Sequence, residues 1–224
     1  MKKIVVLTGA GISAESGIST FRDANGLWEN HDIMEVASIQ GWNNNPELVL
    51  DFYNQRRAQL KIVKPNKAHL YLSYLEKNFD VTIITQNVDD LHERAGSTKI
   101  IHLHGELNKV RSVKDSKTVY KWEEDLNFGN LAKDGGQLRP HIVWFGEEVP
   151  MMDKAIEEVQ KADILVIIGT SLQVYPSASL IEYVPNHSKI ICIDPNEMNL
   201  NNRVVHIKAY ATKGVDYLLD IIKE

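Results

Sequence analysis

Short apolar runs rich in β-branched residues recur along the chain and predict strands. They lie at residues 3–8, 81–85, 99–103, 141–145, 164–169, 189–193 and 204–207. Apolar runs without alternation are typical of strands that are buried on both faces, as in a parallel sheet. Helical patterns lie between several of these runs, at residues 46–60, 66–79 (with Asn66 as the N-cap), 151–161 and 213–222. The alternation predicts an α/β fold whose parallel sheet is covered by helices on both faces.

Two stretches interrupt this alternation. Residues 24–75 contain a turn-rich loop followed by helices without a strand. Residues 106–140 are polar and charged, with a hairpin pattern around 109–122. We expect both to leave the sheet and to pack together as a small second module. The cleft between this module and the sheet is then the expected ligand site.

Small residues follow the first predicted strand. Gly9, Gly11 and Ala14 match the G-x-G-x-x-G/A spacing of dinucleotide sites, in which bare backbone and free N–H groups approach a pyrophosphate. A tight turn that requires positive φ would select the same glycines. The acidic residue expected about 20 positions later, at the end of a second strand, is missing. The pattern therefore supports dinucleotide binding and weakens the case for hydride transfer.

Polar residues also follow three later strands. Gln86, Asn87 and Asp89 could bind an amide-bearing group such as nicotinamide, or Asn87 or Asp89 could cap the next helix. Gly169-Thr170-Ser171 is suited to phosphate or ribose oxygens, and Asp194 could accept from ribose hydroxyls, but ordinary turns would use the same residues.

Two residue pairs could carry further chemistry. His102 and His104 lie on one face of a predicted strand and could exchange a proton near neutral pH. At least one of them is expected to be structural, and no third metal ligand has convincing spacing. Tyr53 and Arg56 share a helix face and could bind a carboxylate. The alternative is that Arg56 and Arg57 form an exposed pair on a solvated face.

Composition limits the class of protein. The 224 residues are 43% hydrophobic and 25% charged, with a net charge of −5, which argues against nucleic-acid binding through a basic patch. No apolar run approaches the length of a membrane span, and the N-terminal run is too short for a signal peptide, so we expect a cytoplasmic protein without membrane association. The single cysteine, Cys192, excludes an internal disulfide and a cysteine-based zinc site within one chain.

Five motifs in order resemble the sirtuins, the NAD-dependent protein lysine deacylases, over almost the whole length. They are GAGISAESGISTFR at 9–22, TQNVDDLH at 85–92, HG at 104–105, VWFGE at 143–147 and GTS at 169–171. The resemblance implies a Rossmann-like parallel sheet plus a small module formed by two insertions. It places the core at about 1–30, 76–105 and 141–224, and the small module at about 31–75 and 106–140, in one catalytic domain of residues 1–224.

The resemblance also implies roles. His104 is the expected general base, and acylated lysine side chains of proteins are the expected substrates. Tyr53 and Arg56 resemble the Y-x-x-R pair of sirtuins that remove succinyl or malonyl groups. The expected NAD contacts are Gly9, Ala10, Gly11, Ser13, Ala14, Phe21, Arg22, Asp23, Trp28, Gln86, Asn87, Asp89, Gly169, Thr170, Ser171, Asp194, Asn196 and Ala211. The expected contacts with the substrate peptide are Val143, Trp144, Phe145, Gly146 and Glu147.

The chain departs from the family in two places. Most sirtuins bind structural zinc through two cysteine pairs, but residues 108–140 contain no cysteine, and Ser112 stands where a first ligand is expected. No structural zinc is therefore expected. We expect the module to be held by apolar packing of Val110, Val113, Val119, Tyr120, Trp122, Leu126 and Phe128. The second departure lies in the strand before the adenosine ribose contact, where the family often has asparagine and this chain has the run ICID at 191–194. Asp194 or the Asn196 backbone could supply the contact.

Two other functions fit the same residues. A mono-ADP-ribosyltransferase also begins by releasing nicotinamide, and a non-catalytic module could bind NAD or ADP-ribose. The presence of His104, Asn87 and Asp89 argues against a pure binding module, which has no need of a proton acceptor.

Overall fold

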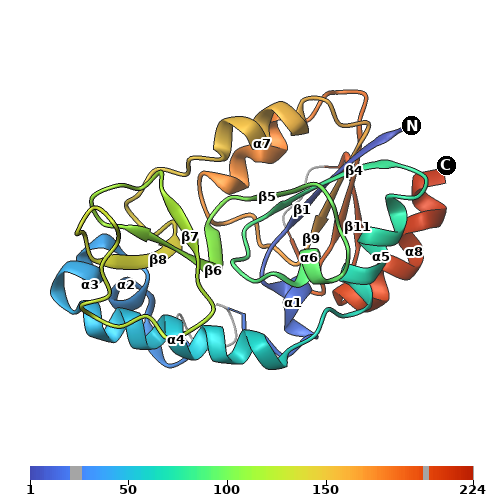
Figure 1. Ribbon diagram of the computed structural model, residues 1–224. Coiled ribbons are helices and arrows are strands. Elements are labelled where there is room, and N and C mark those ends of the chain that lie inside the picture. The colour runs from blue at the N-terminus through green and yellow to red at the C-terminus, as the bar shows by residue number, and fades with distance from the viewer. Residues whose placement is uncertain (21–26, 199–201, 224) are drawn as a thin grey trace.

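The computed structural model describes residues 1–20, 27–198 and 202–223, and a six-stranded parallel sheet forms its larger part (Figure 1). The strand order is β11-β10-β9-β1-β4-β5. The bounds are β1 Lys3–Thr8, β4 Asp80–Thr85, β5 Ile100–His102, β9 Ile164–Ile168, β10 Lys189–Ile193 and β11 Val204–Ile207. The chain builds outward from β1 on one side and then returns to β9 on the other. The crevice at the carboxyl ends of β1 and β9 is therefore the topological switch point, where such sheets bind ligands.

Helices cover both faces of this sheet. Ile4 and Val6 of β1 belong to the core that contains α5 (Lys67–Leu75) and α8 (Ala211–Lys223). Val5 and Leu7 belong to the opposite core, with α7 (Met152–Val159) and η1 (Ser177–Tyr183). Figure 1 shows α7 and the pair α5/α8 on opposite sides of the strands. Burial on both faces explains the unbroken apolar runs of the sequence.

The predicted helices agree with the structure. The pattern at 46–60 is α4 (Pro46–Ile62), and Asn66 caps α5 by accepting from the Ala68 amide. The strand predicted at 141–145 is wrong. The strand is β8 (Leu138–Ile142), which pairs with β6 (Gly105–Ser112) and takes no part in the parallel sheet. The apolar residues that follow β8 form a tight turn instead of continuing the strand.

A small module lies beside the sheet (Figure 1). Its three-stranded antiparallel sheet has the order β7-β6-β8, and the pairing of β6 with β7 (Val119–Lys121) confirms the predicted hairpin. Its remaining elements are β2 (Leu27–Trp28), β3 (His31–Asp32), α2 (Ile33–Val36), α3 (Ile39–Asn44) and α4. Helix α5, which the sequence placed in this module, instead packs on the large sheet. The other domain boundaries stay a prediction. No helix in the described part of the chain is long and apolar enough to cross a membrane.

Apolar packing accounts for only part of the module that lacks zinc-ligating cysteines. Val110 and Leu126 are fully buried, with Tyr120 and Trp122 packed against them. The prediction is wrong for Val113, Val119 and Phe128, whose side chains are exposed.

Ser112, at the position expected for a first zinc ligand, is buried and joins two loops through polar contacts. Its hydroxyl lies 2.9 Å from Asp134 Oδ1 and accepts from the Lys114 amide at 3.0 Å. The same Asp134 oxygen accepts from the Gly136 amide at 2.8 Å. Hydrogen bonds thus join these two loops.

Candidate active site

The turns after β1 and β9 are in direct contact, which explains the glycines there. The Gly9 amide donates to Ile168 O at 3.0 Å, and the Gly11 amide donates to Gly169 O at 2.9 Å. A Cβ on Gly11 would lie 2.6 Å from Gly169 Cα, and one on Gly9 would lie 2.7 Å from Thr170 Cβ. Close packing between the two strand ends therefore requires glycine at positions 9 and 11. The same lack of side chains would let a ligand approach this backbone.

Ser13, Asn87 and Asp89 form one buried hydrogen-bond network below these turns. Asn87 Nδ2 donates to Gly9 O at 3.2 Å and to Ser13 Oγ at 3.1 Å. The Ser13 hydroxyl donates to Asp89 Oδ2 at 3.0 Å, and Asp89 Oδ1 accepts from the Leu91 amide. Burial raises the pKa of Asp89, against the effect of these two donors. Asp89 thus lies where the sequence predicted a site residue, and it also accepts from a backbone amide at the start of α6 (Leu91–Arg94).

Gln86 links the ends of β4 and β9. Its side-chain Nε2 donates to Thr170 Oγ1 at 3.0 Å, and Thr170 is buried. Gln86, Asn87 and Asp89 therefore meet Gly9, Gly169 and Thr170 at one edge of the sheet, as the sequence predicted.

His104 lies at the same edge, just after β5. Its Nδ1 is 3.0 Å from Gln86 O, and its Nε2 is 3.1 Å from Ser177 Oγ. Burial lowers the pKa of His104 below its ordinary value, and the hydrogen bond to the Gln86 carbonyl opposes this shift. A neutral imidazole with an accepting nitrogen is the form that a general base needs. The Ser177 contact was not predicted, because it joins residues 73 positions apart with no sequence pattern between them.

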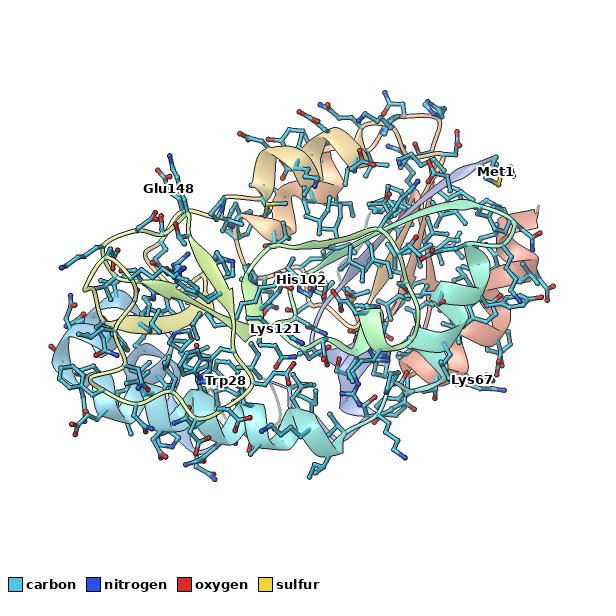
Figure 2. All side chains as sticks on the ribbon, in the orientation of Figure 1. Met1, Trp28, Lys67, His102, Lys121 and Glu148 are labelled. Carbon is cyan, nitrogen blue, oxygen red and sulfur yellow. The ribbon has the colours of Figure 1, made fainter. Side chains whose placement is uncertain are left out.

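His102 has a structural role, as expected for one member of the pair. It lies where the large sheet approaches the small module (Figure 2), with Nδ1 3.2 Å from Asn87 O and Nε2 2.7 Å from Glu93 Oε1. Burial alone would lower the pKa of His102, but the hydrogen bond and charge of Glu93 raise it above its ordinary value. Glu93, His102 and Glu106 have potential ligand atoms within 4.8 Å of one another. Glu106 also pairs with Lys109 at 2.6 Å, and His104 is not part of this group.

A partly open cavity lies next to the buried network. Asp89 contributes to both, and Arg56 lines the cavity from α4. Two Arg56 nitrogens, Nε and Nη1, are buried without a hydrogen-bond partner among the described residues. Burial lowers the pKa of Arg56, and the charge of Glu29, which also lines the cavity, opposes this shift. The remaining wall residues are Ile18, Trp28, Gln59, Leu60, Val88 and Leu107.

Tyr53 and Arg56 differ in their surroundings. Tyr53 is fully buried, and its hydroxyl accepts from Trp144 Nε1 at 3.0 Å. The alternative of an exposed Arg56-Arg57 pair is wrong, because Arg57 is 2% exposed and donates to Glu124 O and Asn54 Oδ1.

Residues 143–147 follow β8 as a fixed turn. The Val143 amide donates to His104 O, and the Phe145 amide donates to Ala37 O, both at 2.9 Å. Phe145 and Gly146 are exposed, whereas Trp144 is 2% exposed. The Glu147 carboxylate lies against Arg139 and Arg111 instead of facing solvent. Phe145 and Gly146 are therefore accessible to a peptide, while the Trp144 and Glu147 side chains have internal partners.

Three other predicted residues, Asp194, Ala211 and Trp28, have contacts within the fold. Asp194 is buried, and its Oδ1 accepts from the amide and the side chain of Asn196 at 2.9 and 3.0 Å, so it stabilises its own turn. Ala211 begins α8, and Trp28 packs its ring on Phe52 with centroids 4.7 Å apart. The predicted NAD contacts Phe21, Arg22 and Asp23 lie outside the described residues.

Comparisons with known proteins agree with this arrangement. A model described as the Sir2 family matches residues 9–176. The chain is 66% identical over 199 residues to a protein of Helicobacter pylori (strain ATCC 700392 / 26695) named NAD-dependent protein deacylase, with 89% of this chain and 87% of the relative covered. A protein of the same name from Bacteroides thetaiotaomicron is 53% identical over 230 residues, with 99% and 98% covered. A solved structure of a Sir2 homologue in complex with NAD has a TM-score of 0.88 and 40% identity, with 99% of this chain and 90% of that chain covered.

Proposed function

The chain belongs to the Sir2 family and acts as an NAD-dependent protein deacylase, and we propose that it removes succinyl and malonyl groups as well as acetyl groups from lysine side chains. The observation that carries the proposal is the Arg56 guanidinium, which lines this cavity with two buried nitrogens that have no hydrogen-bond partner among the described residues. Buried donors without partners are costly, so a ligand that accepts from them gains free energy on binding.

The strand-end residues fit NAD. Bare backbone at Gly9 and Gly11 lies beside a buried carboxamide, a hydroxyl and a carboxylate, supplied by Asn87, Ser13 and Asp89. NAD supplies the ribose carbon that loses nicotinamide and the hydroxyl that accepts the acyl group. We assign the ribose and nicotinamide contacts to Gln86, Asn87 and Asp89. His104 takes the proton of a ribose hydroxyl at Nε2, because its Nδ1 is held by the Gln86 carbonyl.

The cavity fits the acyl chain. Ile18, Val88 and Leu107 provide apolar walls for its methylene groups, and Asp89 connects the cavity to the NAD contacts. At the Arg56 end, a guanidinium can bind a carboxylate through two parallel hydrogen bonds. Phe145 and Gly146 are exposed, and they are suited to contact the substrate peptide beside the acyl-lysine.

An acyl-chain panel tests the proposal. Peptides carrying acetyl-, succinyl- or malonyl-lysine are incubated with NAD, and nicotinamide release and loss of the acyl group are followed by mass spectrometry. Replacing Arg56 with Met removes two buried charge-assisted donors, so kcat/KM for desuccinylation should fall about 10- to 100-fold, while deacetylation changes less than about 3-fold. Lys61→Met removes an exposed cation from the same helix and should affect neither reaction.

The possible results have different meanings. An equal loss of both activities in Arg56→Met would refute the role of Arg56 in acyl-group selection. Wild-type protein that releases no nicotinamide with any peptide would refute the deacylase function itself. Transfer of label from NAD to a protein without loss of acyl groups would favour a mono-ADP-ribosyltransferase.

A further inference from the structure

Nε2 of His104, the nitrogen that serves as the base in the proposed function, contacts the Ser177 hydroxyl. A backbone carbonyl only accepts hydrogen bonds, so the contact of His104 Nδ1 with Gln86 O at 3.0 Å places the proton of the neutral ring on Nδ1. The lone pair then lies on Nε2, where the Ser177 hydroxyl is 3.1 Å away. Ser177 therefore contacts the atom that accepts the ribose proton.

The position of Ser177 is fixed by its element. Its side chain is fully buried, at the first residue of η1. The neighbouring residues Ala178 and Leu180 are buried in the fold, and the Ala178 amide donates to Val174 O at 2.9 Å. Among the described residues, His104 is the hydrogen-bond partner of the Ser177 hydroxyl. A buried hydroxyl held by a packed element and directed at a titrating nitrogen is suited to orienting that nitrogen.

We propose that Ser177 is a positioning residue for His104, a role that rests on the proposed function. While His104 is neutral, the Ser177 hydroxyl donates to Nε2 and holds the ring in its orientation. When a ribose hydroxyl takes this place, the Ser177 O–H rotates away. After proton transfer, Ser177 Oγ accepts from Nε2–H, and this bond is stronger because the imidazolium is charged.

The consequence is a selective effect on one half of the reaction. Nicotinamide release precedes the use of the base, whereas acyl transfer needs it. Ser177 favours the protonated form of His104, so its loss weakens the base without disturbing the NAD contacts at Gly9, Asn87 and Asp89. No charged side chain of the described residues shifts the pKa of His104, so a change at Ser177 is not masked by a neighbouring charge.

The test compares Ser177→Ala with Ser177→Thr and with Ser179→Ala. Ser179 is on the same short helix, but its side chain is only half-buried and its hydroxyl donates to Pro176 O instead of to His104. Nicotinamide exchange and deacylation are measured in parallel at several pH values. In Ser177→Ala we expect kcat for deacylation to fall about 10-fold, exchange to stay within about 2-fold, and the acidic limb of kcat to move to lower pH. Ser177→Thr, which keeps the hydroxyl, should restore deacylation, and Ser179→Ala should behave like wild type.

Two results would overturn the proposal. One is a Ser177→Ala enzyme whose rates and pH profile match those of Ser179→Ala. The other is a parallel loss of exchange and deacylation, which would indicate a structural role. Failure of the proposed function is separate, because wild-type enzyme would then release no nicotinamide at all.

Discussion

Replacing Glu147 with Gln should destabilise the protein through the two arginines that pair with this carboxylate, Arg111 and Arg139. Glu147 accepts from Arg111 Nη2 at 3.0 and 3.2 Å, from Arg139 at 2.8 and 2.9 Å, and from the Trp144 amide at 2.8 Å. The side chains of the two arginines are 8% and 7% exposed. Glutamine keeps the shape but removes the charge and presents N–H groups to a guanidinium. Two buried cations would then lose their counter-ion.

The expected cost can be worked from the burial. Removing one partner of a buried ion pair costs about 3–5 kcal/mol. The Glu147 side chain is 18% exposed, so solvent screens part of this, and we expect about 3 kcal/mol. For a chain of this length that is a fall of about 6–12 °C in the thermal midpoint.

The effect should depend on pH. Burial alone would raise the pKa of Glu147, but the hydrogen bond and charge of Arg139, with the Trp144 amide and Arg111, lower it below its ordinary value. The carboxylate therefore contributes its full stabilisation above the unfolded pKa of about 4.3, and this is lost as pH falls through the lower folded value. The difference between wild type and variant should narrow in that acidic range.

Thermal unfolding followed by circular dichroism provides the assay. Glu148→Gln is the matched control, since Glu148 is the exposed neighbour with the same charge (Figure 2). Equal thermal midpoints for the two variants would refute the reasoning. A Glu147→Gln enzyme with an unchanged midpoint but a raised KM for peptide would instead support the role in peptide binding that the sequence predicted.

Two further predictions concern the strand-end turns and zinc. Gly11→Ala places a Cβ 2.6 Å from Gly169 Cα, so the protein should lose about 1–3 kcal/mol of stability. In steady-state kinetics, kcat/KM for NAD should fall at least about 10-fold, and an unchanged value would contradict the prediction. Because Ser112 and Asp134 join the loops of the small module by hydrogen bonds, elemental analysis should find less than about 0.1 equivalent of zinc, and a chelator should leave deacylation unchanged. One equivalent of zinc would contradict the second prediction.

Much of the fold could be predicted because burial on both faces leaves a direct trace in the sequence. Every strand of the large sheet corresponds to an apolar run, and Asn66 marks the start of α5. The small module left a weaker trace. Strand β6 is polar, and the apolar run after β8 reads as a strand although the chain turns there. The local sequence pattern cannot show whether such a segment forms a strand or a turn. That depends on which strands or side chains pack against it in the folded protein.

The sequence by itself determined the family, the glycine turn and the order of the polar strand ends, since each depends on residues close together in the chain. Only the tertiary structure decided which side chains meet across it. It placed two buried Arg56 nitrogens beside a cavity, directed Glu147 inward to two arginines, and brought Ser177 to the Nε2 of His104. The physical reason is that burial and hydrogen-bond partnership are properties of packed neighbours, and these neighbours come from elements far apart in sequence.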